Sequence, residues 1–173
     1  MSKRSQKGIS FLEIMASVVI MSILLFGFTF VFTEGRNSIN EMGKRRIALC
    51  LVQQMTEEIK SQNFEEAIDT FGLEEGESDT SRQDYDDVDD YNGWSASPPQ
   101  RKDGTPMDSI NPPDYKNFKR EVEVANVSDD NFTDVQDDGS TDSKRITVTV
   151  SSTLDIKRFN DVTIHTVVTN WER

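Results

Sequence analysis

The chain has 173 residues, of which 31 are acidic and 19 are basic, so its formal net charge at pH 7 is −12. This acidic balance argues against nucleic acid and anionic lipid as partners of the soluble part, because like charges repel. The only cysteine, Cys50, excludes an intrachain disulfide, and the only histidine, His165, excludes a histidine cluster for zinc. The sequence contains no phosphate-binding loop, dinucleotide fingerprint or nucleophile elbow, so we expect no enzyme.

The N-terminal 33 residues combine a short basic segment with a long apolar one. The basic segment, MSKRSQKG, ends at Gly8, and an apolar run extends from Ile14 to Phe32. At ~1.5 Å per residue, this run makes a helix of roughly 28 Å, close to the ~30 Å hydrocarbon core of a bilayer. It has no polar face, which a core helix of this length in a soluble protein would show. We therefore predict a transmembrane helix.

Glu13 stands at the start of this apolar run. An ionised side chain near bilayer depth costs at least ~2–3 kcal/mol, so a chain keeps one where it is paired or has a role. The alternative is an ordinary anchor whose flanking carboxylate reaches the headgroups. A secretory signal peptide would have a shorter apolar region followed by its small-residue cleavage site. Here the small residue, Gly8, precedes the apolar run.

The combination of a basic leader, Gly8, Glu13 and an unbroken apolar helix resembles the type IV prepilin signature. Type IV pilins share this signature with the pseudopilins of type II secretion, and the resemblance covers about the first 33 residues. It implies that prepilin peptidase cuts between Gly8 and Ile9 and methylates the new N-terminal amine. It also implies that Phe11, Leu12 and Glu13 act in filament assembly. Ile9 stands where major pilins usually carry phenylalanine, which favours a minor subunit.

In that family, the glutamate is proposed to attract the N-terminal amine of a neighbouring subunit, which here would belong to Ile9. The attraction at ~4 Å grows from ~1 kcal/mol in water to several kcal/mol in a low dielectric, and desolvation offsets part of it. The resemblance also implies a single-pass inner-membrane protein with a cytoplasmic N-terminus and a head in the periplasm or outside, which then enters a filament. Its partners would be prepilin peptidase, other pilin or pseudopilin subunits and an assembly platform in the inner membrane.

We divide the chain into a leader (1–8), a transmembrane and assembly helix (9–33), an amphipathic continuation of that helix (34–72) and a head (73–173). The continuation contains no proline, and its apolar residues recur at helical spacing, which predicts a face that packs on a core. Cys50 lies in it and is interpreted as a small buried residue or a filament contact. The apolar stripe comprises Ile39, Met42, Leu49, Val52, Met55 and Ile59, with Ala48 and Leu51 beside it.

The last hundred residues predict an acidic loop region followed by strands. All five prolines fall between Pro98 and Pro113, and the aromatic residues around them indicate a loop that packs against the head. Residues 118–124, 144–150 and 162–168 alternate and are rich in β-branched side chains, which predicts three strands. We therefore expect an α+β fold, in which a long N-terminal helix, half transmembrane and half amphipathic, packs on a small antiparallel sheet of three or four strands.

The acidic segment around residues 84–92 offers hard oxygen ligands of the kind that Ca²⁺ binds. Asp86, Asp87, Asp89 and Asn92 are the candidate calcium ligands. The segment lacks the glycine and the closing glutamate of an EF-hand loop at the expected offsets. We favour the alternative, a solvated acidic turn, and expect no other cofactor.

The sequence therefore predicts a minor structural subunit of a type IV pilus-type filament. The stretches DDVDDYNGWSASPP and YKNFKREVEV are also similar to loops of some minor pilins, including those of the mannose-sensitive haemagglutinin system. Two alternatives stay open. One is a minor pseudopilin of a type II secretion system. The other is an uncleaved membrane-anchored binding protein that engages a ligand through the loop around Trp94.

Overall fold

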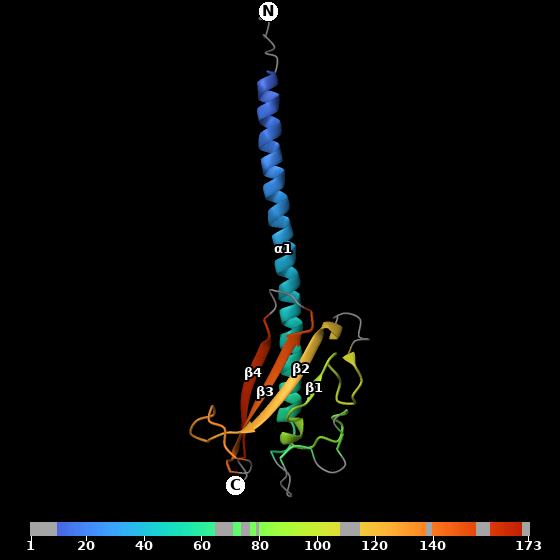
Figure 1. Cartoon of the computed structure of the whole chain (residues 1–173), viewed down its shortest axis with the longest axis vertical. Coiled ribbons are helices and arrows are strands. Elements are labelled where there is room, and N and C mark those ends of the chain that lie inside the picture. The colour runs from blue at the N-terminus through green and yellow to red at the C-terminus, as the bar shows by residue number, and fades with distance from the viewer. Residues whose placement is uncertain are drawn as a thin grey trace, which may run out of the picture. The chain divides into compact units, whose positions relative to one another are not determined.

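The computed structural model describes residues 10–64, 71–73, 77–78, 80–107, 115–137, 140–154 and 160–170. The predicted cleavage site, Gly8 and Ile9, lies outside these residues. By its internal contacts the chain divides into two units, Met1–Met42 and Gly43–Arg173. The elements in chain order are α1 (Phe11–Lys60), η1 (Asp89–Tyr91), β1 (Ser95–Ala96), η3 (Tyr115–Asn117), β2 (Phe118–Asn126), β3 (Ser143–Ser152) and β4 (Val162–Thr169) (Figure 1).

The first unit contains the apolar turns of α1. The helix starts after Ser10, whose carbonyl accepts the amides of Glu13 and Ile14 at 3.0 and 3.2 Å. Hydroxyl groups along the apolar run bond back to the preceding turn, as the Ser17 Oγ does to the Glu13 carbonyl at 2.8 Å. These polar groups are satisfied within the helix. By length and composition, α1 is able to cross a membrane.

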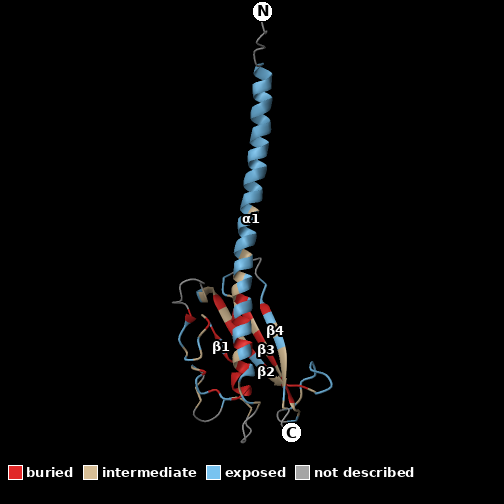
Figure 2. Ribbon diagram, turned by 180° about the vertical axis from the view of Figure 1, so that it is seen from behind, coloured by how far each residue is buried: buried red, intermediate tan, exposed pale blue. Residues whose placement is uncertain are grey.

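In the second unit, the last turns of α1 pack on one face of the sheet (Figure 2). Val52, Met55 and Ile59 of the predicted stripe are fully buried there. Ile39 and Met42 are 69% exposed, so the prediction that they join a packed face is wrong. Helical spacing identifies a face of the helix but not the turn at which its covering layer begins. The buried residues of α1 are Ala48, Leu51, Val52, Met55, Thr56 and Ile59, whereas Leu49 and Cys50 are exposed.

The helix ends at Lys60, although the lack of a proline predicts a continuation to residue 72. The Asn63 amide donates to the Asp86 carbonyl at 3.1 Å, so this stretch pairs with the acidic loop and not with the preceding helical turn. A partner distant in the sequence thus takes the hydrogen bonds that a further turn of helix would use.

The four strands form one antiparallel sheet in the order β1-β2-β3-β4. Val122 lies opposite Val148, and Val124 lies opposite Ile146, so the apolar members of β2 and β3 share one face. β4 places Ile164 opposite Val148 on that face. All three predicted strands are present and slightly longer than expected, and the α+β prediction is confirmed.

The loop between α1 and β2 packs on the head, as its aromatic residues predict. Tyr85, Tyr91 and Trp94 are buried, and the first two rings meet edge to face with centroids 5.0 Å apart. The loop also contributes the short strand β1, in which Ser95 pairs with Glu121 of β2. The sequence pattern does not single out this fourth strand, because a two-residue strand carries no alternation.

Two leucines of α1 test how the helix packs on the sheet. Leu51 is 1% exposed and Leu49 is 39% exposed, so they differ in burial but not in chemistry. We expect Leu51→Ala to lower the free energy of unfolding by about 2–5 kcal/mol, because it leaves a cavity in the core. Leu49→Ala is the matched control, with an expected loss below about 1 kcal/mol. Denaturant unfolding of both variants measures the difference, and equal losses would contradict the packing described here.

Candidate functional site

The residues that the sequence predicts for assembly lie on an exposed apolar surface, which we call the apolar segment (Phe11–Phe32). Phe11 and Leu12 are 77% and 76% exposed, and every other large hydrophobic side chain of the apolar segment is at least 51% exposed. No residue that the structure describes covers this surface. A contiguous apolar surface of this length requires lipid or another apolar partner, because water solvates it poorly.

Glu13 adds the only charge of the apolar segment. It lies in the first turn of α1, where the partial positive charge of the helix N-terminus favours a carboxylate. Its side chain is exposed, and no described residue forms an ion pair or a side-chain hydrogen bond with it. The structure thus presents a carboxylate at one end of an uncovered apolar helix. This arrangement is suited to an intermolecular cationic partner.

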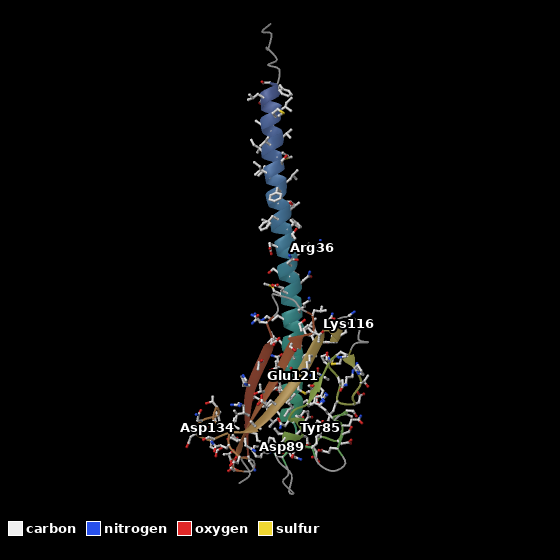
Figure 3. All side chains as sticks on the ribbon, in the orientation of Figure 1. Arg36, Tyr85, Asp89, Lys116, Glu121 and Asp134 are labelled. Atoms are coloured by element: carbon white, nitrogen blue, oxygen red, sulfur yellow. The ribbon has the colours of Figure 1, made fainter. Side chains whose placement is uncertain are left out.

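The predicted calcium ligands have different roles within the head. Asp87 Oδ1 accepts two backbone amides of η1, at 2.9 and 3.2 Å. Asp89, in η1 (Figure 3), forms a buried ion pair with Lys144 of β3. The Asn92 Oδ1 accepts the Val124 amide of β2 at 3.1 Å. These three side chains therefore shape the loop and tie it to the sheet, whereas the fourth, Asp86, is exposed.

Negative charge accumulates around η1. Burial, with repulsion from Asp89 and Asp90, raises the pKa of Asp87 to about 7. The backbone hydrogen bonds that Asp87 accepts and the cation of Lys144 lower the same pKa, but they do not offset the burial. Three buried carboxyl groups thus share the neighbourhood of one buried lysine.

A second polar cluster joins α1, the loop and β2. The Arg82 Nε donates to Glu58 Oε1 at 2.9 Å, and the Arg82 guanidinium lies 4.1 Å from the centre of the Trp94 ring. Arg120 approaches the same ring at 5.3 Å. Both arginines also donate to the Gln100 carbonyl, at 3.3 and 2.5 Å. The indole is thus flanked by two buried guanidinium groups, and the loop is fastened to helix and sheet together.

The two arginines of this cluster were not apparent as core residues from the sequence. Burial and the nearby charge of Arg82 lower the pKa of Arg120 to about 10. A signal for Arg120 exists, because it alternates in phase with Phe118 and Val122 and therefore points to the buried face of β2. No pattern around Arg82 marks it as buried, since it sits in an acidic loop without periodicity.

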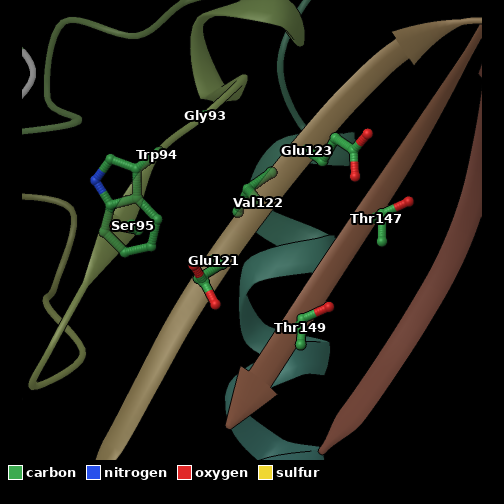
Figure 4. A pocket seen from close by; sticks show the side chains of 8 residues that line it. All are labelled: Gly93, Trp94, Ser95, Glu121, Val122, Glu123, Thr147 and Thr149. Carbon is green, nitrogen blue, oxygen red and sulfur yellow. The ribbon is translucent and has the colours of Figure 1, made fainter.

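The outer face of the sheet carries a polar groove of about 330 Å³ beside the loop (Figure 4). Glu121 and Glu123 of β2 give it negative charge. His165 of β4 is exposed on the same sheet and hydrogen-bonds Thr147 at 3.0 Å, so it has the ordinary role of a polar strand residue. The lining residues are Gly93, Trp94, Ser95, Glu121, Val122, Glu123, Thr147 and Thr149.

No protein-family model matches the chain, and no curated protein or solved structure matches it either. The likeness to pilins therefore rests on the architecture alone. A long N-terminal helix with an apolar first part packs its last turns on an antiparallel sheet, which is a pilin-like arrangement.

Neighbouring glutamates of α1 test the buried cluster. Glu58 pairs with Arg82, whereas Glu57 is exposed and pairs with Lys60 on the same helix face. We expect Glu58→Gln to lower the free energy of unfolding by about 3 kcal/mol, because it leaves a buried guanidinium without its counter-charge. Glu57→Gln is the control, with an expected change below about 0.5 kcal/mol. Chemical denaturation measures both, and an unchanged stability for Glu58→Gln would refute the role given to the pair.

Proposed function

We propose that this protein is a minor structural subunit of a type IV pilus-type filament. On this proposal, prepilin peptidase removes residues 1–8, methylates the amine of Ile9, and leaves a subunit that assembles through its N-terminal helix. The observation that carries the proposal is Glu13 at the end of an uncovered apolar helix, joined to a head of pilin-like architecture. The subunit has a structural role and no catalytic one.

The apolar segment supports a protein that moves between two apolar surroundings. Lipid tails and neighbouring apolar helices solvate its side chains about equally well, so hydrophobicity alone gives little preference for the filament over the membrane. A specific contact must then supply the difference. Among the described residues of the apolar segment, Glu13 is the one side chain whose charge is able to do so.

On this proposal, the pairing of Glu13 with an amine makes assembly depend on processing. A carboxylate near bilayer depth is unfavourable by about 2.5–3.5 kcal/mol on insertion scales. Removal of the leader creates a positively charged amine at Ile9, which a neighbouring subunit offers to Glu13. The attraction between this amine and the Glu13 carboxylate is several-fold stronger in a low dielectric than in water. The two charges then move from the membrane into the filament as a pair.

The proposal places the subunit first in the inner membrane, as a single-pass protein with a cytoplasmic N-terminus and a head in the periplasm or outside. Its partners there are prepilin peptidase and the assembly platform, and in the filament they are other pilin subunits. A minor pseudopilin of a type II secretion system would use the same helix and the same charge. The two differ only in the filament that the subunit enters.

A second candidate, an uncleaved membrane-anchored binding protein, draws support from the polar groove next to Trp94. The two glutamates of the groove favour a cationic or hydroxyl-rich ligand. We rank this candidate second because the groove accounts for neither Glu13 nor the position of Gly8 before the apolar run.

Substitution of Glu13 tests the proposed function. We expect Glu13→Gln, which keeps the shape but removes the charge, to reduce incorporation into filaments at least tenfold. A lost contact of about 1.4 kcal/mol suffices for such a factor. The measurement is the amount of the protein in sheared filaments relative to the amount in membranes, in the native host.

The matched control is Glu34→Gln, which removes one carboxylate beyond the other end of the apolar segment. In the Glu13→Gln variant, the head should unfold at the same temperature as in the wild type, because Glu13 lies outside the second unit. Normal incorporation of Glu13→Gln, or an equal defect in both variants, would overturn the role of Glu13.

A further inference from the structure

The two edges of the sheet differ in length. β1 forms one edge and has only two residues, whereas β4 forms the other edge and has eight (Figure 1). β4 pairs with β3 along one side, and no residue that the structure describes pairs with its other side. An open strand edge presents unpaired backbone donors and acceptors, to which another chain is able to add a strand.

The hydrogen-bond pattern shows which residues of β4 are open. Residues of an antiparallel pair exchange hydrogen bonds at every second position. The Asn170 amide donates to the Asp142 carbonyl at 2.8 Å, one position beyond the pair Ser143–Thr169. The even-numbered residues of β4 therefore bond to β3, and the odd-numbered residues direct their amides and carbonyls away from it. These odd-numbered residues are Thr163, His165, Val167 and Thr169.

β4 lacks the features that usually block an open edge. Proteins place charged side chains, proline or a bulge on such strands, or they keep the strands short. The sequence of β4, VTIHTVVT, includes no lysine, arginine, carboxylate or proline. Its register with β3 runs without interruption from Val162 to Thr169. An edge of this length and composition is suited to strand addition.

The core is only partly covered at this edge. Ile146 and Val148 of β3 are fully buried, whereas Ile164 and Val168 of β4 are half-buried, although they pack against the same core. A further strand beside β4 would cover these two side chains with apolar residues of its own. Its intervening side chains would lie on the outer face, beside the exposed His165.

We propose that β4 is a docking edge, to which an extended segment of a partner protein adds a fifth strand. Alternate residues of a strand lie roughly 7 Å apart, so an extended backbone matches the spacing of the open amides and carbonyls. Main-chain hydrogen bonds would hold the segment, and its alternating side chains would select it. This inference goes beyond the proposed function, since strand addition involves the head alone and does not depend on the filament.

Two observations give the chemistry of the partner segment. β3, with which β4 already pairs, alternates apolar and polar residues and carries Lys144 and Arg145 but no carboxylate. The chain as a whole has a net charge of −12, so it attracts a basic segment and repels a second copy of itself. The partner segment is therefore extended, alternating and basic.

The test uses the full chain in detergent and hydrogen exchange resolved to single residues. The probe is a synthetic peptide with the β3 sequence, SKRITVTVSS, which has this chemistry. Without the peptide, the odd-numbered amides of residues 163–167 should exchange at least about tenfold faster than the even-numbered amides of residues 164–168, because only the latter donate to β3. With saturating peptide, the odd-numbered amides should slow at least about tenfold.

A pair of proline variants gives the matched control. Val167→Pro removes an amide that points away from β3, and proline is tolerated on an edge strand where the amide faces solvent. This variant should keep the wild-type Tm within about 3 °C and bind the peptide about fivefold more weakly, or worse. Val168→Pro removes an amide that donates to β3, so it should lower Tm by more than about 5 °C.

Equal exchange of odd-numbered and even-numbered amides in the wild type would overturn the open edge. Unchanged exchange in the presence of the peptide would overturn strand addition, as would full peptide binding by a folded Val167→Pro variant. A peptide with glutamate in place of its lysine and arginine should bind at least about threefold more weakly, and equal binding would overturn the basic character of the partner. A concentration-dependent dimer that Val167→Pro abolishes would assign the edge to a second copy of the chain and overturn the choice of partner.

Discussion

The uncovered apolar surface of α1 is the physical constraint on which the rest of the structure depends. From Phe11 to Phe32 no described residue shields it, and the hydroxyl groups within it are satisfied by their own helix. Such a surface is stable in lipid or among other apolar helices and unstable in water. No described residue of the head covers this surface. The second unit instead packs a hydrophobic core of its own.

That head depends on buried charge as much as on apolar packing. Arg82, Trp94 and Arg120 form one tie between the loop, α1 and β2, and the Asp89–Lys144 pair forms another to β3. Buried ion pairs add less stability than their Coulomb attraction suggests, because desolvation offsets much of it. In this head, the main effect of the buried ion pairs is to fix the position of the loop. They hold a proline-rich loop, which has few ladder hydrogen bonds of its own, in one position on the sheet.

The fold was largely predictable from local patterns, and the candidate sites only in part. Apolar and polar residues alternate along the whole of each main strand, as they do around Val122, Val148 and Ile164. Each strand was therefore predictable without knowledge of the strands beside it. The burial of Arg82 had no such signal, because contacts with distant parts of the chain, among them Glu58 and Trp94, determine it. The same reason explains Lys60, where pairing of the following residues with the acidic loop ends α1.

If the chain is processed as a prepilin, its mature form lacks residues 1–8 and carries a methylated N-terminus. Intact mass and N-terminal sequencing of the protein purified from its native host measure both changes. We expect a chain that begins at Ile9 and is about 14 Da heavier than its sequence, the mass added by one methyl group. A chain that still begins at Met1 or Ser2 would contradict the account, and it would favour a membrane-anchored binding protein in which Glu13 merely flanks the anchor.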